Sequence, residues 1–267
     1  MLQEPRSGRM AAWGNALLGG FASPDEAVEE IVGGDSVHRI EGLPGEQAPV
    51  GLSLGLGRLR ALGVTGFRVA LPAPGHPLGL SGPSEFNARA LAAQEAVISV
   101  GRAALGLVPQ VTETGSRQDR HVEVVWQCLG VRDAPPADVP SLGEAERELA
   151  EALRDATAAL AKLDVSGAGP AAQAALDAYR ARAERGREVL APGYPARAAR
   201  VLELAQRVAA LTSIAQGRDD SAEHGTAVSA SQIAARAELL RPVERTARRA
   251  QVAAYNAYVE EAERRRG

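Results

Sequence analysis

Lysine is almost absent from this chain of 267 residues. The 30 basic residues are arginines except for one lysine, Lys162. A phosphate-binding loop of the Walker type, a Schiff base and a kinase-like phosphate contact each need a lysine. The sequence therefore excludes these chemistries from the part of the chain that precedes Lys162.

Cysteine, aromatic residues and long apolar runs are also scarce. The one cysteine, Cys128, excludes an intrachain disulfide and a cysteine zinc site, and its apolar neighbours predict a buried, unreactive thiol. Aromatic residues make up 3% of the chain, so its cores must be aliphatic. No apolar run approaches the ~20 residues that a membrane-spanning helix needs. We therefore predict a cytoplasmic protein with no membrane partner.

The charge of the chain does not favour binding to a nucleic acid. The net charge is −3, which gives no global field to attract a polyanion. Four arginines do share one predicted helical face, but Glu238 and Glu244 lie alongside them and few aromatic side chains are present for base stacking. We therefore interpret this stripe as a solvated, salt-bridged helix face rather than as a binding site for nucleic acid. The four are Arg241, Arg245, Arg248 and Arg249.

Metal ligands are dispersed. The four histidines show no paired spacing. The acids between Asp219 and Glu223, beside His224, fall at a predicted helix start, where negative charge complements the helix dipole. We predict neither a metal site nor a cofactor.

A change of composition divides the chain at residues 133–140, the Pro-rich stretch DAPPADVP. Of the 28 glycines, 20 precede Pro140 and 8 follow it. Glycine and proline punctuate a chain of many short elements, whereas Ala, Leu, Glu and Arg extend helices. The prediction is an α/β (or α+β) domain at 1–132, a linker at 133–140 and an all-α domain at 141–267.

The first part alternates helix and strand signals. Ser23 followed by Pro24, Asp25 and Glu26 is a helix start. Further helices are predicted at 9–20, 49–62 and 83–93, and strands at 37–40, 64–71, 96–100, 106–114 and 121–129. The last two strands flank the polar turn 115–119 and predict an antiparallel hairpin. We expect a small mixed sheet.

The second part reads as four helices joined by short connections, which predicts an antiparallel bundle. Pro242 interrupts the last helix and should kink or restart it. The predicted helices are 141–164, 171–190, 196–216 and 221–263.

Two motifs could carry chemistry. Gly51-Leu-Ser-Leu-Gly55 matches a nucleophile elbow, but no buried strand precedes it, so Ser53 is read as a mid-helix residue. The loop 72–82 follows a strand and precedes a helix, where ligands bind in open α/β sheets. His76 is its candidate proton donor, and the amides of Ser84 and Glu85 with Arg68 and Arg89 are candidate anion ligands. A proline-stiffened connection with a solvated His76 is the simpler alternative.

Residues 12–27 and 59–80 resemble a group of uncharacterised actinobacterial proteins. The segments are AWGNALLGGFASPDEA and LRALGVTGFRVALPAPGHPLGL. The resemblance covers the first half of the chain and carries no activity, cofactor or catalytic residue with it.

Two functions from different classes remain. One is a non-enzymatic interaction or scaffold protein whose helical domain binds a partner or a second copy. The other is an enzyme that binds a small molecule or anion at the loop 72–82.

Overall fold

The computed structural model describes residues 4–80, 82–116, 119–132, 134–162, 190–215 and 230–265. The chain forms two compact units, each described by itself below. The α/β unit comprises Glu4–Val139, Leu190–Pro195 and Tyr255–Gly267, and the helical unit comprises Met1–Gln3, Pro140–Val189 and Ala196–Ala254. The last turns of the chain therefore group with the sheet.

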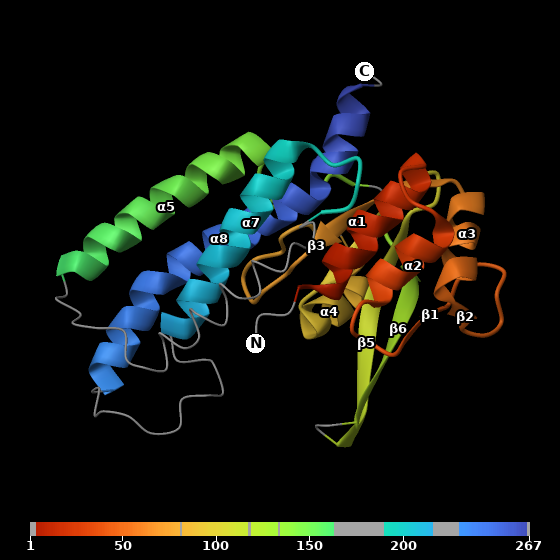
Figure 1. Cartoon of the computed structure of the whole chain (residues 1–267), viewed down its shortest axis with the longest axis horizontal. Helices are drawn as coiled ribbons and strands as arrows, with labels where there is room; N and C mark the ends of the chain where they lie inside the picture. Colours follow the sequence, from red (N-terminus) through yellow and green to blue (C-terminus); the bar gives the residue numbers. More distant parts are fainter. Residues whose placement is uncertain are drawn as a thin grey trace. The chain divides into compact units, whose positions relative to one another are not determined.

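The α/β unit contains four helices and six strands among its described residues (Figure 1). The helices are α1 (Arg6–Gly19), α2 (Pro24–Val32), α3 (Leu52–Ala61) and α4 (Ser84–Ala93). The strands are β1 (Val37–Glu41), β2 (Val50–Gly51), β3 (Val64–Ala70), β4 (Ala96–Gly101), β5 (Leu105–Ser116) and β6 (Asp119–Gly130).

All six strands form one sheet in the order β2-β1-β6-β5-β4-β3. β1 and β6 run parallel and every other neighbouring pair is antiparallel, which confirms the predicted mixed sheet. β5 and β6 pair without interruption from Leu105 opposite Gly130 to Ser116 opposite Asp119, so the predicted hairpin is also confirmed. The two edges of the sheet are β3 and the two-residue strand β2.

Local signals explain where several helices begin and end. At α2, the Ser23 hydroxyl accepts from the Glu26 N–H while the Glu26 carboxylate accepts from the Ser23 N–H, with Pro24 in the first turn. α3 starts directly after β2, which places Ser53 exposed in the first turn rather than in mid-helix.

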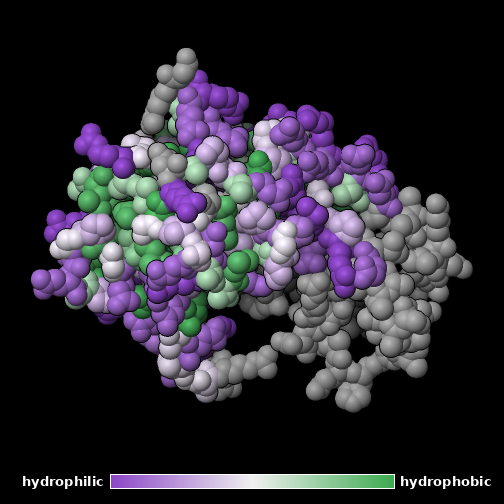
Figure 2. Space-filling model, turned by 180° about the vertical axis from the view of Figure 1, so that it is seen from behind, coloured by the Kyte–Doolittle hydropathy of each residue, from purple (hydrophilic) through white to green (hydrophobic). Residues whose placement is uncertain are grey.

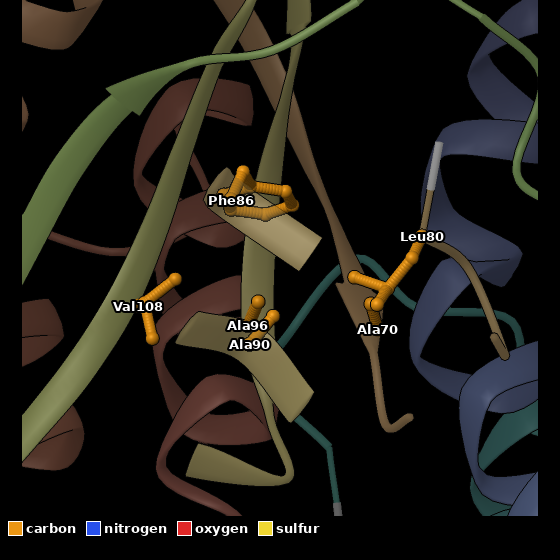
Figure 3. Close-up of a cluster of buried hydrophobic side chains, with 6 residues drawn as sticks. All are labelled: Ala70, Leu80, Phe86, Ala90, Ala96 and Val108. Carbon is orange, nitrogen blue, oxygen red and sulfur yellow. The ribbon is translucent and has the colours of Figure 1, made fainter. Parts of the chain in front are cut away.

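Helices cover both faces of the sheet. Alternate residues of a strand point to opposite faces, and on β3 Phe67 lies against Gly14 of α1, whereas Ala70 joins the cluster under α4. Figure 3 shows this second cluster, in which α4 side chains meet residues of β3, β4 and β5. Its buried members are Ala70, Leu80, Phe86, Ala90, Ala96 and Val108.

The described helices of the second part are α5 (Leu142–Lys162), α7 (Ala196–Ala215) and α8 (Ala230–Arg264). α5 contacts α7, and ion pairs join Arg197 to Glu146 and Arg249 to Glu148. α8 continues through Pro242 as one helix, so the predicted restart does not occur. The helix predicted at 171–190 lies almost entirely outside the described residues, and the four-helix antiparallel bundle stays a prediction.

Candidate functional site

The loop 72–82 is held by its own packing and backbone bonds. Leu78 and Leu80 are buried, with 1% and 4% of their surface exposed. Ala73 and His76 exchange two backbone hydrogen bonds, and the Gly79 N–H donates to the Ala137 carbonyl. The His76 side chain is partly exposed at the tip of this loop. A packed loop favours the structural alternative for this segment over a ligand loop.

Of the predicted anion ligands, Ser84, Glu85 and Arg89 lie on α4, and Arg68 lies on β3. Ser84 and Glu85 are exposed at the first turn, and no side chain caps it. Glu85 forms an ion pair with Arg89 at 2.9 Å, and Arg89 also donates to Gln127 at 2.6 Å. The structure thus brings Glu85 and Arg89 together, one turn apart. Their role in binding stays a prediction.

Arg68 points toward a different partner. Its guanidinium donates to Glu263, near the end of α8, at 2.6 Å. Arg68 is therefore engaged by a carboxylate that the sequence analysis did not consider.

A buried charged array lies between α1 and the sheet, and sequence reasoning missed it. Asp35, in the turn before β1, accepts from Arg6 through both carboxylate oxygens at 2.8 and 2.9 Å and from Arg9 at 2.8 Å. The His38 Nε2 lies 3.1 Å from the same carboxylate, and the Trp126 Nε1 donates to the His38 Nδ1 at 3.3 Å. Five side chains from α1, the α2–β1 turn, β1 and β6 therefore form one connected network.

The tautomer of His38 follows from its neighbours. An indole N–H can only donate, so Nδ1 must accept and Nε2 carries the proton that reaches Asp35. Burial lowers the pKa of His38, against the opposing effect of Asp35. For Asp35, burial raises the pKa, but the bonds from His38 and Arg6 and the two guanidinium charges outweigh it and lower the pKa. The array holds a neutral imidazole beside a carboxylate shared by two arginines.

Such an array resembles acid–base machinery in composition but is closed to a substrate. The side chains of His38 and Asp35 are 0% and 2% exposed. A general base must reach the proton that it removes. The array therefore acts as a clamp that fixes α1 to the sheet.

A second polar cluster covers the free edge of β3. The Asn15 carboxamide accepts from the Phe67 N–H at 2.7 Å and donates to the Phe67 carbonyl at 3.0 Å. Asn256, on α8, does the same at Val69, with distances of 2.6 and 3.2 Å. Each amide thus stands in for one residue of a neighbouring strand, which satisfies the backbone groups that an edge leaves unpaired.

Tyr194 connects the two halves of this cap. The Asn15 Nδ2 donates to the Tyr194 hydroxyl, and that hydroxyl donates to the Tyr255 carbonyl, both at 3.0 Å. The Tyr194 ring also lies 5.3 Å from that of Tyr258. Burial raises the pKa of Tyr194, so the phenol stays protonated and can donate. We call Asn15, Asn256 and Tyr194 the β3 cap.

Other candidate features offer little chemistry. A hollow beside β3, lined by Thr65, Gly66, Tyr258, Glu263 and their neighbours, is large enough only for a water molecule. Burial raises the pKa of the Cys128 thiol to about 11, which disfavours the reactive thiolate. In the described residues, no three His, Cys, Asp or Glu side chains gather as metal ligands.

The described helices include none that is both long and apolar enough to cross a bilayer. The face seen in Figure 2 carries both hydrophobic and hydrophilic residues. The exposed large apolar side chains of the protein include Phe21, Leu54, Leu91 and Val111.

Comparison with known proteins places relatives in mycobacteria. The sequence-family model of the Rv1486c-like protein N-terminal domain matches residues 7–140. The family model of the Rv1486c-like protein C-terminal domain matches residues 143–252. An uncharacterised protein of Mycobacterium leprae is 32% identical over 73% of this chain and 69% of its own length. The uncharacterised protein Rv1486c of Mycobacterium tuberculosis is 29% identical over 95% of this chain and 96% of its own. No solved structure matches the chain.

Proposed function

We propose that this chain, which belongs to the Rv1486c-like protein family, is a non-enzymatic interaction or scaffold protein. Its helical unit would bind a partner or a second copy. One observation carries the proposal: the buried polar side chains best suited to catalysis hold the fold together. Asp35 and His38 fix α1, and Asn15 and Asn256 cap β3. Side chains committed to these contacts are not free for a substrate.

The composition of the helices supports the same proposal. The helical unit buries many alanines, among them Ala198, Ala205, Ala247 and Ala250. Small side chains let helix axes approach closely. On α5 Leu142, Ala145 and Leu149 form a buried stripe, and Ala150 lies on the exposed surface of the helix together with Glu144, Arg147, Glu151 and Arg154. That exposed face of α5 is where we expect a partner helix to pack.

The mass of the purified full chain and its capture of partners test this proposal. Ala150→Trp places a large side chain on the exposed face of α5 and should abolish association or capture. Ala88→Trp is the matched control, because Ala88 is equally an exposed helical alanine, but on α4. A wild-type chain that stays monomeric and captures nothing would overturn the proposal, as would equal behaviour of the two variants.

The second candidate function is an enzyme that binds a small molecule or anion at the loop 72–82. The start of α4 favours it, since Ser84 and Glu85 are exposed there and no side-chain cap bond is made. The Arg132 side chain lies beside Gly82, close to the same turn. Together with His76, Arg68 and Arg89, these groups are the ligands we would assign.

A thermal-shift screen of inorganic phosphate and phosphorylated metabolites separates the two functions. The enzyme hypothesis requires a rise in melting temperature that His76→Ala abolishes and His121→Ala, an exposed histidine on β6, preserves. If no compound shifts the wild-type chain, the hypothesis fails. We place either function in the cytoplasm, because its reducing conditions keep a free thiol such as that of Cys128 reduced.

A further inference from the structure

The hairpin of β5 and β6 extends beyond the other strands (Figure 1). β4 pairs with β5 only at Gly106 and Leu107. From Gln110 to Ser116 every residue of β5 is exposed. We call residues 109–116 the arm. Along the arm, β5 has β6 on one side and no strand of the described chain on the other.

Two hydrogen bonds establish which backbone groups of the arm face outward. The Val131 N–H donates to the Ala104 carbonyl, on the β6 side of the chain. The Leu105 N–H donates to the Ser99 hydroxyl of β4, on the other side. Backbone groups alternate between the two sides of a strand, and the β5–β6 register has no shift. The outward residues of the arm are therefore Pro109, Val111, Glu113 and Gly115.

Pro109 fits this assignment, because it lacks an N–H and proline is tolerated at the open side of an edge strand. In the described residues, the outward N–H and C=O groups of Val111 and Glu113 have no recorded hydrogen bond. Glu113 pairs with Arg120 and Gln110 with Gln127, both on β6.

We propose that the open edge of the arm pairs with the same edge of a second copy, antiparallel about a twofold axis at Thr112. An exposed edge recognises an added strand by its backbone. Because residues 110–116 of the arm are exposed on both faces, an incoming strand meets no side-chain pocket there, so a self-complementary register is what gives specificity. This interface lies on the α/β unit and does not depend on the proposed role of the helical unit.

The register follows from the residues. A twofold axis at Thr112 places Val111 of each copy opposite Glu113 of the other copy. Each of these residues then forms hydrogen bonds through both its outward N–H group and its outward C=O group. An axis at Glu113 would set two carboxylates opposite one another, which is destabilising. An axis at Val111 would set Glu113 opposite Pro109, which has no N–H to give, whereas the favoured axis sets only Gly115, near the end of the arm, opposite Pro109. The favoured axis also sets Thr112 against Thr112 and Gln110 against Thr114, both polar pairs.

Proline substitution tests the proposed backbone pairing. Val111→Pro removes one outward N–H and leaves the β6 ladder intact, so it should shift the chain to monomer in sedimentation equilibrium. Val111→Thr, which keeps the N–H and the branched side chain, should associate as wild type does. Both are measured in the wild-type and the Ala150→Trp background, which separates this contact from one through α5. Association that persists in Val111→Pro, or a wild type that is monomeric at every concentration, overturns the proposal.

A cross-link tests the register without a proline. Thr112 faces its copy in a non-hydrogen-bonded pair, where Cα atoms are about 4.5 Å apart, within the range that a disulfide spans. Thr112→Cys should therefore give a disulfide-linked dimer under mild oxidation with diamide. Gln110→Cys is the control, because its two copies lie about 13 Å apart along the strands. Equal cross-linking of the two variants, or none in Thr112→Cys, contradicts the proposed axis.

Discussion

Two stretches of strand edge in one sheet, that of β3 and that of the arm of β5, are treated differently. At β3, the Asn15 and Asn256 carboxamides bond both backbone groups of Phe67 and Val69. Along the arm of β5, the corresponding groups of Val111 and Glu113 have no recorded partner among the described residues. β3 is capped by side chains of α1 and α8, whereas no strand of the described chain pairs with the outward edge of the arm.

The difference shows where the fold permits another strand. An unpaired edge is a template for association, and proteins usually cover it. Capping β3 needs two helices held in place, and the charged array around Asp35 fixes one of them, α1, which also carries Asn15. Substitutions in the charged array and in the β3 cap should therefore weaken the capped edge, whereas a substitution on the arm should affect stability least.

The largest effect is expected from Asp35→Asn. The change removes the carboxylate that Arg6 and Arg9 share, and because their side chains are only 12% exposed, the loss of this counter-charge costs about 3–5 kcal/mol of unfolding free energy. Urea unfolding measures it. Asp25→Asn, an exposed acid in the first turn of α2, is the control and should cost at most about 1 kcal/mol. Comparable losses in the two variants would contradict the clamp role of Asp35.

Removal of one amide from the β3 cap should cost somewhat less. Asn256→Ala leaves the N–H and C=O of Val69 unsatisfied, for a loss of about 2–4 kcal/mol, and light scattering should show aggregation through the exposed edge. Asn87→Ala removes an amide that accepts from the Gly82 N–H, away from any sheet edge. We expect Asn87→Ala to lower stability without aggregation. A soluble, unperturbed Asn256→Ala would show that the cap is dispensable.

Acid should weaken the same clamp. The pKa of His38 is lowered in the folded chain. Below about pH 6.5 the unfolded chain therefore binds a proton that the folded chain does not, and the free energy of unfolding decreases as the pH is lowered. The lowered pKa of Asp35 adds a further loss below about 3.9, its unfolded value.

Between pH 7.5 and 5, the single proton at His38 should contribute a slope of unfolding free energy of at most about 1.4 kcal/mol per pH unit, and Glu95, whose pKa burial raises, contributes with the opposite sign. His38→Gln keeps an acceptor for Trp126 and should flatten this part of the profile. Urea titrations at each pH measure both chains. An unchanged slope in His38→Gln would assign the pH dependence elsewhere.

The smallest effect is expected on the arm. Arg120→Ala breaks the pair with Glu113, whose two side chains are about half exposed. Exposed pairs contribute at most about 1 kcal/mol, so thermal unfolding should change little. A loss as large as that of Asn256→Ala would mean that the arm is buried against something, in conflict with an open edge.

Local signals predicted much of the fold. The strands at 64–71, 96–100, 106–114 and 121–129 and the hairpin turn were readable because alternation and turn residues act over a few positions. The mixed sheet is confirmed, as are the helices of the first part and those predicted near 141–164, 196–216 and 221–263 in the second, whereas the helix predicted at 171–190 stays a prediction. β2 was missed because two residues carry no alternation.

The contacts that matter most could not be read in this way. Asn15 lies 52 residues from Phe67, and Asn256 lies 187 residues from Val69. The one available signal was a polar residue inside an apolar helical run, as at Asn15 among Ala and Leu and at Asn256 among Ala, Val and Tyr. Composition also gave no sign that α8 changes unit near Tyr255, because its helical character is continuous there. The predicted ligand residues His76, Ser84 and Glu85 remain predictions.

Residue-resolved amide hydrogen exchange tests the contrast between the two edges most directly. The N–H groups of Phe67 and Val69 should exchange slowly at every protein concentration, because side-chain amides hold them. Those of Val111 and Glu113 should exchange rapidly in dilute protein and slow down as the concentration rises. Rapid exchange at Phe67 and Val69, or concentration-independent protection at Val111 and Glu113, would contradict one capped edge and one open edge that pairs with its copy.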